Sequence, residues 1–270
     1  MKIYDKKLAY PYFVWMVLFT VVPLFIVVYY AMTDAEGNFT LNNLTSISGY
    51  GSVFARSLLL ALIATVICLV LAFPIGYFLS RLRVNKQHIM LMLVMLPMWM
   101  NFLLRTIAWQ SLLEKTGVIN MILQSIGLPK QNLINTEGAI ILGMIYNFLP
   151  FMVLPIYNSL IKIPQDTFDA AKDLGANWIQ TLWRITLPQI LPGIVSGITM
   201  VFVPALTTFV ISDLLGGGKI LLIGNVIEQS FKQNSNWHVG SGLSMVLMVF
   251  IIASMALVAK YDKEGEGSSF

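Results

Sequence analysis

The stretch SLLLALIATVICLVLAFPIGYFLS, residues 57–80, runs for 24 residues without a charged side chain. A bilayer core is crossed by about 20 residues of α-helix, whereas a strand of a membrane barrel needs only about 9 to 11. Backbone groups inside the bilayer must find their hydrogen-bond partners within the protein, which restricts spanning segments to helices and closed barrels. The length of this run therefore predicts a membrane-spanning helix.

Similar apolar runs occur along the whole chain of 270 residues, which is 57% hydrophobic and only 11% charged. An average soluble domain carries about 25% charged residues. We therefore predict an all-α, polytopic membrane protein that forms one transmembrane domain over residues 1–270. The six predicted spans are residues 12–32, 57–80, 89–109, 138–160, 189–212 and 243–259.

Basic residues predict the orientation of the chain, because Lys and Arg beside the spans stay on the cytoplasmic side during insertion. With the N-terminus inside, eleven of the 17 Lys and Arg residues fall in inner segments and six in outer segments. We therefore expect both termini, and residues 161–188, on the cytoplasmic side of the membrane. The basic residues form no stripe with interleaved aromatics, so nucleic-acid binding is not expected.

The sequence lacks the common catalytic and metal-binding patterns. The segment GGGKI, residues 216–220, imitates the end of a phosphate-binding loop, but Ile220 replaces the required Ser or Thr. The two histidines, His88 and His238, are predicted on opposite membrane faces, and no HExxH pattern occurs. We expect no enzymatic activity, no metal site and no bound cofactor in this chain.

A polar insert, residues 161–188, separates two apolar spans and contains DAAKDLGANWIQTLWRITLP at residues 169–188. Pro164 suits the first position of a helix, and Gly175 suits the left-handed residue that ends it. Asn177 is suited to cap a second helix, which we expect to end before Pro188. The apolar stripe of that second helix is Trp178, Leu182 and Ile185. We predict a bent pair of helices, here called the elbow.

Patterning alone leaves two interpretations of the elbow open. In the first, the small side chains of Ala170 and Ala171 let a partner protein come close, while Asp169 and Asp173 make charged contacts. In the second, the elbow is an amphipathic connector that rests on lipid headgroups.

The elbow resembles the EAA motif of ABC importer permeases, with Asp in place of the usual Glu. The matching residues are Asp169, Ala170, Ala171, Gly175, Ile185, Leu187 and Pro188. The resemblance implies the MetI-like fold of type I importers with six transmembrane helices, in which the elbow is the coupling helix that docks on an ATPase subunit. It also implies that Gly175 supplies the bend, that Asp169 makes a polar contact, and that the partner subunit uses the ATP and Mg²⁺.

Three other segments resemble the permeases of spermidine/putrescine importers, the PotB type. They are NFLLRTIAW, LPFMVLPIYNSL and ISDLLGGGKILLIGNVI, and the likeness covers most of residues 91–239. The resemblance implies a polyamine cargo and a bacterial inner membrane. It also implies ATP-binding subunits of the PotA type, a second permease of the PotC type and an external binding protein of the PotD type.

A polyamine route should offer carboxylates, carbonyls and aromatic faces to the ammonium groups of the cargo. Asp213 is the first candidate for a cargo contact and Glu228 is the second. The candidate aromatic walls are Trp99, Trp109 and Tyr146. Two alternatives remain open: Asp213 forms a salt bridge with Arg105, and the aromatic residues are interfacial anchors.

Other functions also remain open at this point. An ABC permease for another small solute, such as an amino acid, would show the same elbow. A stand-alone carrier or channel would need ionisable residues within its spans, and the six predicted spans offer almost none. We make two further local predictions. Residues 216–231 form a hinge followed by an amphipathic helix, which lies in the membrane interface, caps the outer mouth or is a surface helix. Gly193 and Gly197 mark close packing between helices.

Overall fold

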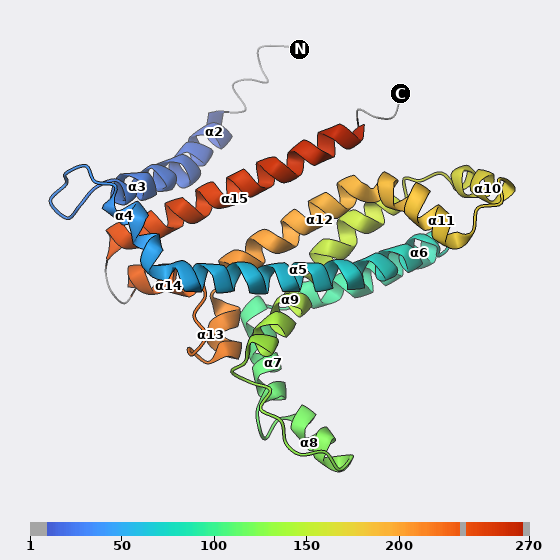
Figure 1. The fold of residues 1–270 in the computed structure, drawn as a ribbon, viewed down its shortest axis with the longest axis horizontal. Helices are drawn as coiled ribbons and strands as arrows, with labels where there is room; N and C mark the ends of the chain where they lie inside the picture. The colour runs from blue at the N-terminus through green and yellow to red at the C-terminus, as the bar shows by residue number, and fades with distance from the viewer. Residues whose placement is uncertain (1–9, 233–235, 267–270) are drawn as a thin grey trace. The chain divides into compact units, whose positions relative to one another are not determined.

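The structure is a computed structural model that describes residues 10–232 and 236–266 (Figure 1). The chain ends, predicted to be cytoplasmic, lie outside these ranges, as do Lys2, Lys6 and Lys7. The helices are α2 Tyr10–Met16, η1 Val17–Val21, α3 Val22–Ala31, α4 Asn42–Thr45, η2 Ser46–Tyr50, α5 Gly51–Ser80, α6 Val84–Met95, η3 Leu96–Trp99, α7 Phe102–Leu113, α8 Val118–Ser125, α9 Glu137–Leu160, α10 Gln165–Asp173, α11 Trp178–Thr181, η4 Leu182–Thr186, α12 Leu187–Thr207, α13 Val210–Gly216, α14 Ile223–Lys232 and α15 Trp237–Glu266.

The prediction of an all-α membrane protein is confirmed. Five helical stretches among the described residues are long and apolar enough to cross a membrane, and a sixth is a bent pair. The five stretches are Tyr10–Ala31, Asn42–Ser80, Glu137–Leu160, Trp178–Thr207 and Trp237–Ala256.

The predicted third span, residues 89–109, is sharply bent in the structure. The helices on either side of the break, Val84–Trp99 and Phe102–Ser125, meet at an angle of 86°. Met100 is extended, with ψ of 146°, and the Asn101 side chain caps α7 by accepting hydrogen bonds from the backbone N–H groups of Leu103 and Leu104. A side-chain cap starts a new helix in a new direction, so an unbroken apolar pattern conceals the break.

The predicted fifth span, residues 189–212, differs at both ends. It is continuous with the second helix of the elbow, so the expected end before Pro188 does not occur. The π-helical turn η4 ends at Thr186, two residues before Pro188, whose ring would crowd the Arg184 carbonyl in an ordinary α-helix. At the other end, Thr208 is extended, with ψ of 138°, and α13 begins as a separate helix.

The chain divides into two compact units. One combines the segment up to Ser52 with Val226–Ile252, and the other combines Val53–Asn225 with the segment from Ala253. In the first unit, the side-chain amide of Asn43 donates hydrogen bonds to the carbonyls of Tyr30, Ala31 and Thr33, which fixes the turn after α3. That the two units work as one permease domain stays a prediction.

Helix α9 forms the centre of the second unit. Helix α12 packs along it, and α13 and α7 also contact it (Figure 1). Helix α5 presents a row of small buried residues at helical spacing, Ala61, Ala64, Cys68, Ala72 and Gly76. At Gly76 this row meets Ile156 and Tyr157 of α9. Small residues let helices approach closely in lipid, where packing rather than the hydrophobic effect drives association.

The predicted close packing through Gly193 and Gly197 is confirmed. A methyl group on Gly193 would lie 2.6 Å from the Pro155 carbonyl oxygen and would overlap Ser159. One turn later, a methyl group on Gly197 would lie 2.6 Å from the Met152 sulfur. The backbone of α9 therefore leaves no room for a side chain at Gly193.

We expect Gly193→Ala to destabilise the protein by about 1 to 3 kcal/mol, because the added methyl group forces α9 and α12 apart. The thermal midpoint of the detergent-solubilised protein, followed by size-exclusion chromatography after heating, measures this loss. Gly138→Ala is the matched control, since the nearest atom, Thr136 Oγ1, would lie 3.8 Å from its methyl group. Equal midpoints for the two variants would contradict the close packing.

Candidate functional site: the elbow between α9 and α12

A tight turn at Gly175 ends the first helix of the elbow, α10. The N–H of Gly175 donates to the Lys172 carbonyl at 2.8 Å, and the N–H of Ala176 donates to the Ala171 carbonyl at 3.0 Å. This pair of hydrogen bonds is the Schellman arrangement, which requires a left-handed residue after the helix. Gly175 has the predicted left-handed conformation, with φ of +77°, and a Cβ atom added to it would meet no atom within 4 Å. Pro164 precedes α10 as its N-cap, one position earlier than expected.

The second helix of the elbow begins at Trp178, directly after this turn. The Asn177 side-chain oxygen accepts a hydrogen bond from the Gln180 N–H at 2.8 Å, and the Gln180 side chain accepts one from the Asn177 N–H at 3.0 Å. This capping box confirms Asn177 as the helix start. Only Leu174, Gly175 and Ala176 therefore separate α10 from the Asn177 cap. Ile185 lies in η4 and Leu187 and Pro188 open α12, so these three residues belong to the helix that continues from the elbow into the span.

One face of α10 is open to solvent. It carries Asp169, Ala170 and Asp173, and Leu174 beyond it is 89% exposed. Ala171 is buried, so the prediction that both alanines leave room for a partner is wrong for Ala171. Phe168 is buried as well and anchors the inner face of α10. Of the two alanines, only Ala170 therefore lies on the surface that a partner could touch.

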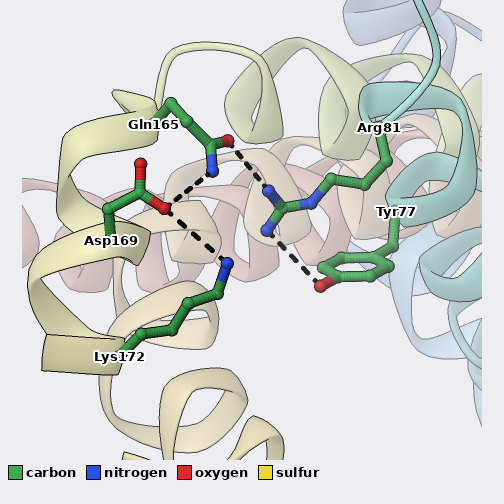
Figure 2. A network of polar contacts seen from close by, with 5 residues as sticks. All are labelled: Tyr77, Arg81, Gln165, Asp169 and Lys172. Atoms are coloured by element: carbon green, nitrogen blue, oxygen red, sulfur yellow. Dashed lines mark hydrogen bonds and ion pairs between the residues drawn. The ribbon is translucent and has the colours of Figure 1, made fainter.

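A polar network joins α10 to the end of α5 (Figure 2). Arg81, the residue after α5, donates hydrogen bonds to the Gln165 side chain at 3.1 Å and to the Tyr77 hydroxyl at 3.4 Å. Gln165 in turn donates to Asp169 at 3.3 Å. The Lys172 ammonium lies 3.6 Å from the same oxygen of Asp169. The acidic residue of the motif is thus part of a chain of contacts that reaches α5.

A pocket of about 410 Å³ lies between the end of α5 and the elbow. Its lining includes Tyr77 and Arg81 from the α5 side, Phe168 from α10, and Trp178 and Leu182 from the second helix of the elbow. Two residues of the predicted apolar stripe, Trp178 and Leu182, therefore line this pocket, although Trp178 is 75% exposed.

The first cargo candidate, Asp213, belongs to a buried hydrogen-bond cluster around Asn225, which is 1% exposed. The Asn225 side-chain oxygen accepts hydrogen bonds from the Ser212 hydroxyl at 2.6 Å and the Leu222 N–H at 2.9 Å. Its NH₂ group donates to the Phe209 carbonyl at 3.1 Å and to the Asp213 carboxylate. The cluster ties α13 to the start of α14.

Helix α14 is the helix predicted in residues 216–231, but its first turn is not a surface feature. Ile223 is fully buried, and its N–H donates to the Ser57 hydroxyl at 2.8 Å. Gly224 lies against the Thr207 and Thr208 carbonyls. The interpretation as a plain surface helix is therefore wrong for this turn.

Arg105 has partners other than the predicted Asp213. Its guanidinium donates to the Pro97 carbonyl at 2.6 Å and lies 5.8 Å from the centroid of the Tyr146 ring. Pro97 belongs to η3, whereas Arg105 belongs to α7, so this hydrogen bond crosses the 86° bend. A buried guanidinium beside a carbonyl at a helix C-terminus is favourably placed, because that end of a helix is negatively polarised. Arg105 thus stabilises the bend.

The structure brings together only some of the other cargo candidates. The rings of Trp109 and Tyr146 meet edge to face, with centroids 5.3 Å apart. Trp99 is 71% exposed at the end of η3. Glu228 forms a salt bridge of 2.9 Å with Lys232, one turn further along α14.

Four residues of these sites were not predicted from the sequence: Arg81, Gln165 and Phe168 at the elbow, and Asn225 in the buried cluster. Asn225 could have been predicted as a buried polar group, since it is a lone amide within the mostly apolar segment KILLIGNVI. Arg81 could not have been found in this way, because a basic residue directly after a span is expected for orientation alone.

We expect Asn225→Ala to lower the thermal midpoint strongly, because it leaves several buried donors and acceptors without partners at roughly 1 to 3 kcal/mol each. Ser230→Ala on the same helix is the control, since its buried hydroxyl donates only to the Val226 carbonyl of its own helix. Thermal unfolding in detergent compares the two variants. A loss for Asn225→Ala no larger than that for Ser230→Ala would contradict the role of the cluster.

The chain is similar to known transport proteins over most of its length. The family of binding-protein-dependent transport system inner membrane components matches residues 72–261. The spermidine/putrescine transport system permease protein PotB of Haemophilus influenzae is 36% identical over 249 residues, which cover 88% of this chain and 87% of that protein. PotB of Escherichia coli K12 is 37% identical over 254 residues, which cover 90% and 92% of the two chains.

The fold is also similar to that of a solved transporter. A chain of a bacterial alginate ABC transporter, crystallised with a periplasmic protein that holds an alginate pentasaccharide, superimposes with a TM-score of 0.79 and 16% identity. The superposition covers 94% of this chain and 91% of the other. With the family match over more than half of the chain, these findings show that the protein belongs to the family of binding-protein-dependent transport system inner membrane components.

Proposed function

We propose that the chain is the permease subunit of an ATP-driven importer for spermidine and putrescine. The observation that carries the proposal is the identity of 36–37% to PotB proteins over about nine tenths of the chain. The partners that we propose are ATP-binding subunits of the PotA type, a second permease of the PotC type and an external binding protein of the PotD type. ATP and Mg²⁺ are used by the ATP-binding subunits, and this chain is not itself an enzyme.

The elbow is the proposed contact with the ATP-binding subunit, on the cytoplasmic side together with both termini. Its exposed face includes Asp169, Ala170 and Asp173, and Leu174 directly after α10 is exposed too. The turn at Gly175 and the Asn177 cap hold the two helices of the elbow in a defined angle. Such an elbow can transmit a push without losing it in a flexible loop.

Movement would pass from the elbow to the membrane through helices that are continuous with it. The stretch Trp178–Thr207 carries the elbow into the membrane without an interruption, and α9 leads into α10 through four residues, 161–164. Because α9 and α12 pack closely at Gly193, we propose that the two helices move together as a rigid body when the ATP-binding subunits close.

Along the cargo route, Asp213 remains the first candidate for contact with an ammonium group and Glu228 the second. The ring of Tyr146 already faces one cation, the Arg105 guanidinium, and Trp109 extends that aromatic surface. Both observations support aromatic faces as part of the route. Trp99 stays a candidate at the exposed end of η3.

We expect Gly175→Val to abolish most uptake while the protein still inserts and assembles, because a β-branched residue is strained at φ of +77° and would reset the angle of the elbow. Polyamine uptake and ATP hydrolysis by the complete transporter in proteoliposomes measure the effect. Gly127→Val is the matched control, because Gly127 has φ of +83° with open space around it but follows α8. Equal uptake by the two variants would contradict the coupling role.

We expect the isolated chain in vesicles to accumulate no putrescine, and the complete transporter to do so when ATP, Mg²⁺ and the external binding protein are present. An excess of unlabelled spermidine should compete, because both cargoes share ammonium groups at similar spacing along a flexible chain, whereas neutral amino acids should not. Uptake of radiolabelled putrescine with a panel of competitors tests the proposal. Uptake by the chain alone would indicate a carrier, and competition by amino acids alone would indicate a different cargo.

A further inference from the structure

We propose that Arg81 is a positioning residue that ties the coupling helix α10 to the end of α5, so that a third helix moves together with α9 and α12. The inference rests on the proposed coupling role of the elbow and extends it. The tie between Arg81 and α10, called here the α5 latch, consists of Arg81, Gln165 and Phe168.

The guanidinium of Arg81 lies between two rings from different helices. Its Cζ atom is 3.9 Å from the centroid of the Phe168 ring on α10 and 5.1 Å from that of the Tyr77 ring on α5. Phe168 is only 7% exposed, so the guanidinium covers one face of an anchored ring. A planar, delocalised cation can stack in this way while its N–H groups still donate in the plane, which the ammonium group of Lys cannot do.

Hydrogen bonds extend the latch along α10 (Figure 2). Arg81 donates to Gln165 in the first turn of the helix, Gln165 donates to Asp169, and the same oxygen of Asp169 meets Lys172. Asp169 is the acidic residue of the motif that we propose at the contact with the ATP-binding subunit. A partner that binds Asp169 therefore acts on a residue linked to α5 through one intermediate side chain.

The α5 latch connects the elbow to a helix to which it has no short covalent link. Residues 161–164 link α10 to α9, and the helix Trp178–Thr207 links the elbow to α12, but no covalent link of comparable length joins the elbow to α5. The α5 latch supplies that connection at the membrane end of the elbow, beside the 410 Å³ pocket. Because Arg81 is exposed, its contacts are individually weak, and we expect the latch to affect coupling more than stability.

The test uses the complete transporter in proteoliposomes and compares Arg81→Ala with Arg83→Ala. Arg83 is an exposed residue of the same type two positions along, and its side chain makes no hydrogen bond or salt bridge with the part of the chain that the structure describes. We expect Arg81→Ala to reduce uptake about two- to fivefold, the effect of losing a contact of roughly 0.5 to 1 kcal/mol, with ATP hydrolysis changed less. Arg83→Ala should leave the ratio of uptake to hydrolysis unchanged.

Two further variants separate positioning from general damage. Phe168→Leu should raise the ATP hydrolysed per polyamine as Arg81→Ala does, and the double variant should be no worse than the poorer single variant, because both remove one interaction. Arg81→Lys should restore only part of the coupling. If Arg81→Ala lowers the yield of assembled transporter, Gln165→Ala is used instead; it removes the acceptor for Arg81 and the donor to Asp169 while Arg81 stays in place, and it should give the same loss of coupling.

The outcomes distinguish this inference from the proposed function. Loss of coupling for Gly175→Val together with normal coupling for Arg81→Ala would overturn the latch and leave the elbow in place. Normal coupling for both would overturn the coupling role as well. Independent, multiplicative losses in the double variant would also overturn the latch, since Arg81 and Phe168 would then act separately.

Discussion

The close packing of α12 on α9 is the contact on which the rest of the second unit depends. At Gly193 the two backbones approach so closely that a methyl group would lie 2.6 Å from the Pro155 carbonyl. In lipid, where apolar side chains gain little by leaving one apolar environment for another, this close fit is what holds two helices together. Because the elbow joins the ends of these same helices, its position is fixed from both sides.

Much of the architecture was predictable, because the bilayer imposes both the length and the type of its spanning elements. The run at residues 57–80 ends at Ser80, where α5 ends, and the run at residues 138–160 matches α9 to within one residue. The third and fifth spans were less predictable. Their breaks, at Met100 and at Thr208, depend on an Asn101 cap and on carbonyls that turn toward α14, and neither interaction changes the apolar pattern.

The elbow was predictable because its turn and its helix cap depend only on neighbouring residues. Gly175 and Asn177 act on hydrogen bonds within a few residues of themselves, so their roles follow from local chemistry. The α5 latch was not predictable, because Arg81 and Gln165 are 84 residues apart in the chain and meet only in the folded protein. The Asn225 cluster lies between these cases: a buried amide in an apolar run needs partners, but which carbonyls and hydroxyls supply them depends on the fold.

The continuity of Trp178–Thr207 has a mechanical consequence. A helix of this length is a lever about 45 Å long at 1.5 Å per residue, with one arm in the elbow and the other in the membrane. Gly193, where this helix rests on α9, lies near its middle, so a tilt of α9 and α12 together about this point would move the elbow and Thr207 by similar distances in opposite directions. The break at Thr208 ends this lever before α13, and the carbonyls of Thr207 and Thr208 rest against Gly224, so a tilt of the lever acts directly beside the buried cluster around Asn225.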